Sequence, residues 1–201
     1  MNIILIGMPS CGKSTVGVIL AKLLGYDFID TDLLIQRQTG LRLSEIIQSR
    51  GLDAFLAAEE AACLSLCADH SVIATGGSVI YSDTAMRHLK GLGTIVFLSV
   101  DFKTLQSRLH DVRGRGVVLR PGQSLVDLYA ERAPLYREYA DITVPEGQGS
   151  LEETVQAVYR KVQEDAMDTG TVEQLLEIFR RINRIDEKEQ KQKNLQTARQ
   201  A

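Results

Sequence analysis

The first fifteen residues contain a glycine-rich pattern of the kind that binds phosphate groups. Residues 7–15 read G-M-P-S-C-G-K-S-T and match G-x-x-x-x-G-K-[ST], with an apolar run before them and a helix-period segment after. In this pattern backbone N–H groups and a helix N-terminus face the polyphosphate. Lys13 is expected to reach the β- and γ-phosphates of ATP and to serve catalysis, and the Ser14 hydroxyl to ligate Mg²⁺. The predicted ATP-binding residues here are Ser10, Cys11, Gly12, Lys13, Ser14 and Thr15.

Two carboxylates follow the next apolar run, in the sequence Asp30-Thr31-Asp32. Ligands of an open parallel sheet gather at the carboxyl ends of its strands, so both acids are expected to face the γ-phosphate. One acid suits a Mg²⁺-bound water, and the other can accept the proton of an attacking hydroxyl. Asp and Thr also cap helices, and Leu33 begins an apolar run. We predict that the segment both caps a helix and serves catalysis.

A pair of glycines follows the third apolar run, in Ala74-Thr75-Gly76-Gly77-Ser78. Paired glycines allow the backbone to approach a ligand closely, although a plain tight turn explains them equally well.

These residues need a scaffold, and the pattern of the chain predicts an α/β domain. Short apolar runs alternate with helix-period segments, which is typical of a parallel sheet covered by helices on both faces. Strands are predicted at residues 2–6, 26–29, 71–75, 94–100 and 141–144. Helices are predicted at residues 13–24, 43–49, 52–68, 82–89, 102–109, 124–139 and 151–164.

The predicted kinase domain covers residues 1–165 and includes a lid loop at about 111–123. Beyond it, an apolar stripe predicts an amphipathic helix over residues 166–185. Residues 186–201 are almost entirely polar, and we expect them to be disordered.

Composition narrows the classes of function. The 201 residues are 44% hydrophobic and carry a formal net charge of −3, which argues against binding nucleic acid by bulk charge. The sequence contains neither a signal peptide pattern nor a run long enough to span a bilayer. Three cysteines form no disulfide framework or zinc ligand set, and Cys63 and Cys67 are expected on a buried helical stripe. We expect a cytoplasmic protein with no membrane or nucleic-acid partner.

The four motifs together resemble the shikimate kinase family. The phosphate loop, D-T-D, T-G-G and the R-A-P-L-Y of Arg132–Tyr136 follow one another in the order and rough spacing of that family, over residues 1–160. The resemblance implies a three-layer α/β/α P-loop kinase fold, with a five-stranded parallel sheet of order 2-3-1-4-5 and a lid. It also implies the transfer of phosphate from ATP to shikimate, as a step of aromatic amino acid biosynthesis, with Mg²⁺ as cofactor.

The resemblance assigns roles to individual residues. Asp32 would bind the acceptor hydroxyl and act as base, and Asp30 would lie in the Mg²⁺ shell. Gly76 and Gly77 would contact the substrate, and Arg132 would bind its carboxylate. Arg108 stands where the family has an arginine that contacts the nucleotide.

The sequence departs from the family in the acceptor pocket and in the lid. Leu56 stands where the family has the second arginine of a carboxylate clamp, and one of three glycines in the substrate loop is missing. One hydrogen bond from arginine to a carboxylate contributes about 1.5–3 kcal/mol, so its loss weakens binding roughly ten- to a hundredfold. Arg113, Arg115 and Arg120 are alternatives for closing on the phosphates, and Arg120 is preferred because a proline follows it.

Several functions remain open on the sequence alone. Shikimate is the first candidate for the acceptor, and another small hydroxy acid or polyol, such as gluconate, is the alternative. A nucleoside monophosphate kinase would need more arginines in its acceptor site. A nucleotide-gated binding module would not need Asp32. We expect a monomer or a homodimer.

Overall fold

The computed structural model describes residues 1–109, 120, 122–146 and 150–166. The chain forms two compact units, Met1–Tyr159 and Arg160–Ala201. Most of the predicted lid, and all of the predicted C-terminal helix and tail beyond residue 166, lie outside the described residues. The first unit contains the sheet, the helices packed on it and every residue predicted to take part in chemistry.

All five predicted strands are present and form one parallel sheet. Its order is β2-β3-β1-β4-β5, as predicted. The strands are β1 (Asn2–Ile6), β2 (Asp27–Asp30), β3 (Ser71–Ala74), β4 (Gly93–Val100) and β5 (Ile142–Glu146). Every residue of β1 and β3 is buried, which explains their continuous apolar runs. Because β1 pairs with both β3 and β4, the chain changes direction across the sheet at β1, where such folds bind ligands.

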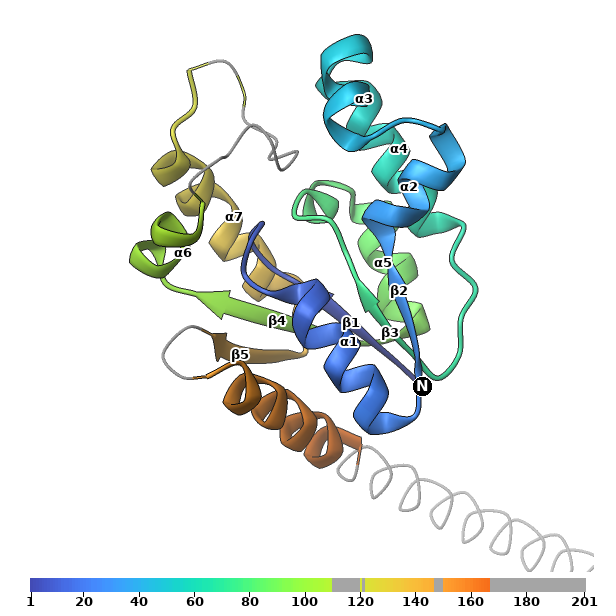
Figure 1. The fold of residues 1–201 in the computed structure, drawn as a ribbon, viewed down its shortest axis with the longest axis vertical. Helices are drawn as coiled ribbons and strands as arrows, with labels where there is room; N and C mark the ends of the chain where they lie inside the picture. Colours follow the sequence, from blue (N-terminus) through green and yellow to red (C-terminus); the bar gives the residue numbers. More distant parts are fainter. Residues whose placement is uncertain (110–119, 121, 147–149, 167–201) are drawn as a thin grey trace, which may run out of the picture. The chain divides into compact units, whose positions relative to one another are not determined.

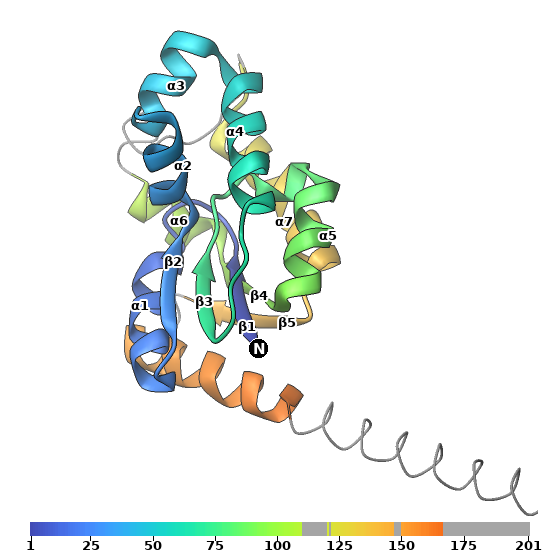
Figure 2. The same ribbon diagram turned by 90° about the vertical axis from the view of Figure 1, so that its right-hand side faces the viewer.

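Helices lie on both sides of the sheet, so the predicted three layers are present. Figure 2 shows the strands between α1 on one side and α5 and α7 on the other. The helices are α1 (Lys13–Leu24), α2 (Thr31–Thr39), α3 (Leu43–Arg50), α4 (Leu52–Leu64), α5 (Asp83–Leu92), α6 (Phe102–Arg108) and α7 (Leu125–Tyr139). A 3-10 turn, η1 (Val79–Tyr81), precedes α5, and residues 151–166 are helical. None of the described helices is long and apolar enough to cross a membrane.

Three helices form a small group beyond the end of the sheet. Helices α2 and α3 both pack on α4, and Figure 1 shows them together on the side of the molecule toward which β2 points. Their shared core consists of Ile35, Ile46, Phe55 and Ala62. This packing holds the ends of α2 and α4 beside the phosphate loop.

The expectation for Cys67 was wrong, because α4 ends four residues earlier than the sequence predicted. The Ser65 hydroxyl donates to Ala62 O at 2.8 Å and accepts from Gln38 Nε2 at 3.0 Å, which favours a turn over a further helical turn. Cys63 is buried as expected, whereas Cys67 lies beyond the helix and is exposed.

Candidate active site

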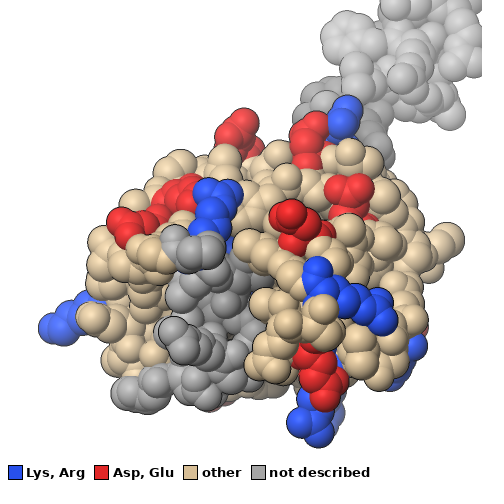
Figure 3. Space-filling view, turned by 90° about the horizontal axis from the view of Figure 1, so that it is seen from above, with Lys and Arg blue, Asp and Glu red and all other residues tan. Residues whose placement is uncertain are grey.

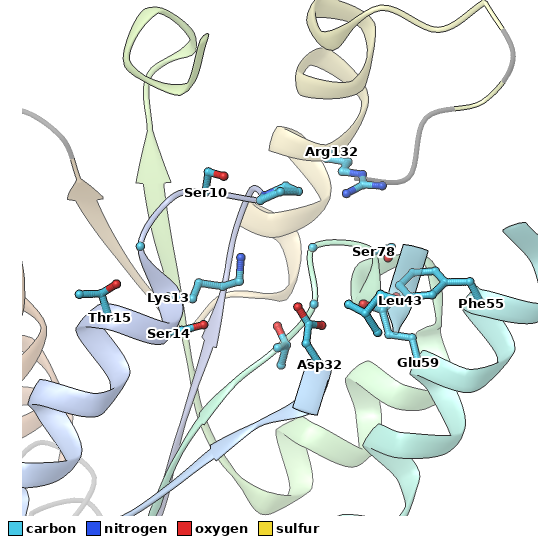
Figure 4. Close-up of a pocket in the computed structure, with 15 residues that line it drawn as sticks. Ser10, Lys13, Ser14, Thr15, Asp32, Leu43, Phe55, Glu59, Ser78 and Arg132 are labelled. Carbon is cyan, nitrogen blue, oxygen red and sulfur yellow. The ribbon is translucent and has the colours of Figure 1, made fainter. Parts of the chain in front are cut away.

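A pocket of about 360 Å³ opens where β1, β2 and β3 end, and most of the predicted residues line it (Figure 4). Its wall comes from the phosphate loop, the starts of α1 and α2, the loop after β3, and three helices. The lining residues are Pro9, Ser10, Gly12, Lys13, Ser14, Thr15, Asp32, Leu43, Phe55, Glu59, Thr75, Gly76, Gly77, Ser78 and Arg132. The topology therefore brings together four motifs that are far apart in the chain.

The loop after β1 has the curled backbone that phosphate binding needs. Ser10 and Gly12 have φ values of 63° and 95°, in the left-handed region. A Cβ atom at Gly7 would lie 2.7 Å from Leu98 O, so only glycine fits there. The ammonium of Lys13 donates to Gly7 O at 2.8 Å and to Met8 O at 3.0 Å, which holds it at the pocket wall.

Ser14 and Asp30 form a direct contact that suits a metal ion. Ser14 Oγ donates to Asp30 Oδ2 at 2.7 Å. Mg²⁺ prefers oxygen ligands and needs only one or two carboxylates when phosphates and waters complete its shell. The donor set therefore fits Mg²⁺.

Asp30 also starts α2, so the predicted helix cap of the D-T-D segment is confirmed, while its catalytic use stays a prediction. Asp30 Oδ1 accepts from the backbone N–H of Asp32 at 2.9 Å, as an N-cap does. This bond leaves the Asp32 side chain free to turn into the pocket, where Figure 4 shows it opposite Lys13.

The loop after β3 comes close to Asp32 and Glu59 because its two glycines have no side chains. A Cβ atom at Gly76 would overlap Glu59 Oε1 and lie 3.2 Å from Asp32 Oδ1. The N–H of Gly76 donates to Thr31 Oγ1 at 3.0 Å, which ties the loop to the start of α2. A Cβ atom at Gly77 would lie 2.9 Å from Pro9 Cδ and 3.2 Å from Arg132 Nη1. The glycine pair is therefore required by packing around the pocket and is more than a plain turn.

The R-A-P-L-Y segment lies within α7 and supplies the arginine of the pocket. Helix α7 begins with a capping box between Ser124 and Asp127. Arg132 is 1% exposed, and its guanidinium points into the pocket in Figure 4. Tyr136 Oη donates to Gly77 O at 2.5 Å, so the last residue of the motif fixes the glycine loop.

Glu59 is a charged residue of the pocket that the sequence analysis missed. It is 1% exposed, and its Oε1 makes no hydrogen bond to any described residue. The signal was present in the sequence, because Glu59 shares one helix stripe with the buried Phe55, Ala62 and Cys63. A carboxyl group on an otherwise apolar stripe is unusual enough to indicate a site.

Burial gives both acids of the pocket an unusual affinity for protons. Burial and the neighbouring Asp30 raise the pKa of Asp32 to about 6, although Lys13 acts to lower it. Burial likewise raises the pKa of Glu59 to about 7. Hydrogen bonds from Ser78 oppose that rise, the charge of Asp32 adds to it, and Arg132 opposes it. Asp32 is therefore mostly ionised at neutral pH, and Glu59 is about half protonated.

Two of the predicted nucleotide-contacting arginines, Arg108 and Arg120, lie in the described part of the chain. Arg108 ends α6 and Arg120 precedes α7, and neither is among the described residues that line the pocket. Arg120 lies 3.4 Å from the Glu131 carboxylate, with its side chain 63% exposed. Arg113 and Arg115 fall outside the described residues. The roles of these arginines stay predictions.

Leu56 faces a second cavity, of about 390 Å³, beside the first. The two cavities share Glu59 and Ser78, and Tyr81 also lines the second. Leu56 precedes Glu59 by three residues on α4, so their side chains are neighbours on the helix. Arg132 is the one arginine among the described residues lining the first pocket.

The face of the molecule on which α3 lies carries charges of both signs. Lys and Arg side chains are interspersed there with Asp and Glu on the described surface (Figure 3). On the described part of this face, charge does not gather by sign as it does over a nucleic-acid groove.

Comparisons with known proteins agree on one family. The family model described as "SKI: Shikimate kinase" matches residues 9–163. A shikimate kinase of Pseudomonas aeruginosa is 39% identical over 147 residues, which cover 72% of this chain and 86% of that protein. One of Thiobacillus denitrificans is 34% identical over 164 residues, covering 80% and 90%.

Solved structures give the same result. The shikimate kinase of Acinetobacter baumannii in complex with shikimate has a TM-score of 0.73 and 33% identity, covering 82% of this chain and 93% of that one. The shikimate kinase of Aquifex aeolicus has a TM-score of 0.72 and 32% identity, covering 83% and 98%.

The raised pKa of Glu59 predicts a cost in stability at higher pH. Its folded value of about 7 lies above its ordinary value of 4.5, so the folded state is favoured at low pH and loses stability as pH rises through that window. The free energy of unfolding of Glu59→Gln, relative to that of the wild type, should rise by up to about 3 kcal/mol between pH 4.5 and 8. Urea unfolding at several pH values measures this difference.

Glu152→Gln, at an exposed position, serves as the matched control. A difference between Glu59→Gln and wild type that does not change with pH would contradict the assignment.

Proposed function

Because the chain belongs to the shikimate kinase family, we propose that it transfers the γ-phosphoryl group of ATP to a hydroxyl of shikimate. The observation that carries the proposal is one pocket holding the phosphate loop, Asp32 and Arg132 together. These groups match a polyphosphate, a reacting hydroxyl and a carboxylate. Gluconate bears the same two acceptor groups and is therefore a useful test acceptor.

The donor side of the pocket binds ATP. Backbone N–H groups of the loop between β1 and α1 and the N-terminus of α1 face the phosphates, and Lys13 moves from the loop carbonyls to the β- and γ-phosphates. Ser14 and Asp30 would hold Mg²⁺. When bound, the ion neutralises charge on the β- and γ-phosphate oxygens.

The acceptor side binds a hydroxylated carboxylate. Arg132 pairs with its carboxylate, while Phe55 and Leu43 offer an apolar wall to its ring carbons. Asp32 accepts the proton of the attacking hydroxyl, the new O–P bond forms, and the bond to the bridging oxygen of ADP breaks. Glu59 Oε1 offers a hydrogen bond to a second hydroxyl of the acceptor.

The product is shikimate 3-phosphate, and the reaction serves aromatic amino acid biosynthesis. We place it in the cytoplasm, where ATP is supplied.

The reaction is tested by measuring ADP release with shikimate, gluconate and a panel of hydroxy acids. Shikimate should support the highest kcat/KM, and Asp32→Asn should lower kcat by about 10²–10⁴-fold because the base is lost. Thermal unfolding of the variant in parallel checks that it folds. A rate of ADP release that no acceptor changes would contradict the proposal.

The metal assignment predicts a changed need for Mg²⁺. Asp30→Asn should raise the Mg²⁺ concentration for half-maximal activity about tenfold or more. Asparagine caps helices as well as aspartate does, so α2 should keep its start. Asp27→Asn, at the other end of β2, is the control. An unchanged Mg²⁺ dependence in Asp30→Asn would contradict the role.

The absent clamp arginine predicts a gain of function. Leu56→Arg would place a guanidinium beside Glu59 and near the acceptor carboxylate, and should lower KM for shikimate about tenfold. KM for ATP should not change. Leu56→Met, neutral and of similar length, should behave as wild type. If Leu56→Arg leaves KM for shikimate unchanged or raises it, position 56 does not belong to the clamp in this protein.

A further inference from the structure

Tyr81, at the end of η1, contacts the arginine of the pocket through both its hydroxyl and its ring. Arg132 Nε donates to Tyr81 Oη at 3.1 Å. The guanidinium carbon lies 5.0 Å from the centre of the Tyr81 ring, within the range of a cation–π contact. The hydroxyl and the ring together restrain both the position and the tilt of the guanidinium.

The restraint matters because of how arginine binds a carboxylate. Two parallel N–H···O hydrogen bonds form only when the guanidinium and the carboxylate lie in the same plane. A free arginine side chain populates many rotamers, and binding must otherwise remove this conformational entropy. With Nε bonded to Tyr81, Nη1 is directed to the side of Gly77, at the pocket.

Tyr81 is itself held in place by a second side chain of α7, the helix that carries Arg132. Glu131 hydrogen bonds with the Tyr81 hydroxyl, and burial raises the pKa of that hydroxyl, so it keeps its proton at neutral pH and donates to Glu131 while it accepts from Arg132. Glu131 also accepts from Gln123 Nε2 at 2.7 Å and pairs with Arg120 at 3.4 Å. The Tyr81 hydroxyl therefore bridges two consecutive side chains of α7, and its orientation is fixed from both sides.

We propose that Tyr81 is a positioning residue that aims Arg132 at the carboxylate of the acceptor. The inference rests on the proposed function, because it takes the acceptor to carry a carboxylate. The pocket needs such a residue because Leu56 leaves Arg132 as the one arginine among its described lining residues. One guanidinium must then supply both the strength and the alignment that two would share.

The test is Tyr81→Phe, which keeps the ring and removes the hydroxyl. KM for shikimate should rise about five- to tenfold, while kcat and KM for ATP stay within about twofold of wild type. Tyr139→Phe is the matched control, since it removes an exposed hydroxyl from α7 near Asp83 and should change none of these values. Thermal unfolding of both variants separates a loss of alignment from a loss of fold.

A second acceptor isolates the carboxylate. With the carboxamide of shikimate, which cannot form the charged pair, Tyr81→Phe and wild type should have the same KM. In an Arg132→Lys background, Tyr81→Phe should add no further rise in KM for shikimate, because the partner of the hydroxyl is gone.

Three results would overturn the proposal. These are an unchanged KM for shikimate in Tyr81→Phe, an equal rise with the carboxamide, and a fall in kcat that accompanies the rise in KM. Failure of the proposed function is recognised separately, because the wild type would then not turn over shikimate. If another hydroxy acid is the acceptor, the same comparison is made on it, and turnover of no carboxylate-bearing acceptor would overturn both ideas.

Discussion

The close approach of two carboxyl groups to the backbone at Gly76 is the constraint on which the pocket depends. A side chain at Gly76 would displace Glu59 and press on Asp32. The approach requires β2 and β3 to be neighbours, because the loop after β3 must reach Thr31 at the start of α2. It also requires β1 beside β3, so that Lys13 stands across the pocket from the acids. The sheet order is thus the arrangement that lets these groups meet.

Burial raises the pKa of both acids in the pocket, and the partners that oppose this rise differ for each acid. Asp32 is stabilised in its ionised form by Lys13, which suits a base that must accept a proton. The ionised form of Glu59 is stabilised chiefly by hydrogen bonds from Ser78 and less by the charge of Arg132. With pKa values of about 6 and about 7, Asp32 is the more ionised of the two carboxyl groups at neutral pH.

The strands and the phosphate loop could be predicted from sequence because their signals are local, whereas the sheet order was implied by the resemblance to the shikimate kinase family. Apolar runs mark the strands, and the phosphate loop depends on residue types at fixed spacing. The acceptor pocket is different, since its groups belong together only through tertiary packing. Glu59 stands in an alanine-rich helix and Tyr81 in a short turn, and neither has a motif of its own. The end of α4 depended on hydrogen bonds of Ser65, one of them from another helix, which no periodicity encodes.

Leu56 and Glu59 are best understood together. An arginine at position 56 would lie beside Glu59 on α4 and would keep that carboxyl group ionised, so the pair would add no net charge to the pocket. With leucine there, an ionised Glu59 would leave a negative charge that opposes an acceptor carboxylate at Arg132. Burial instead raises the pKa of Glu59 to about 7, so the carboxyl group is about half protonated at neutral pH and carries only part of that negative charge. The pocket can therefore lack one arginine with a smaller change in its net charge. Without the second arginine, the alignment of the acceptor carboxylate depends on the groups that hold Arg132 in place.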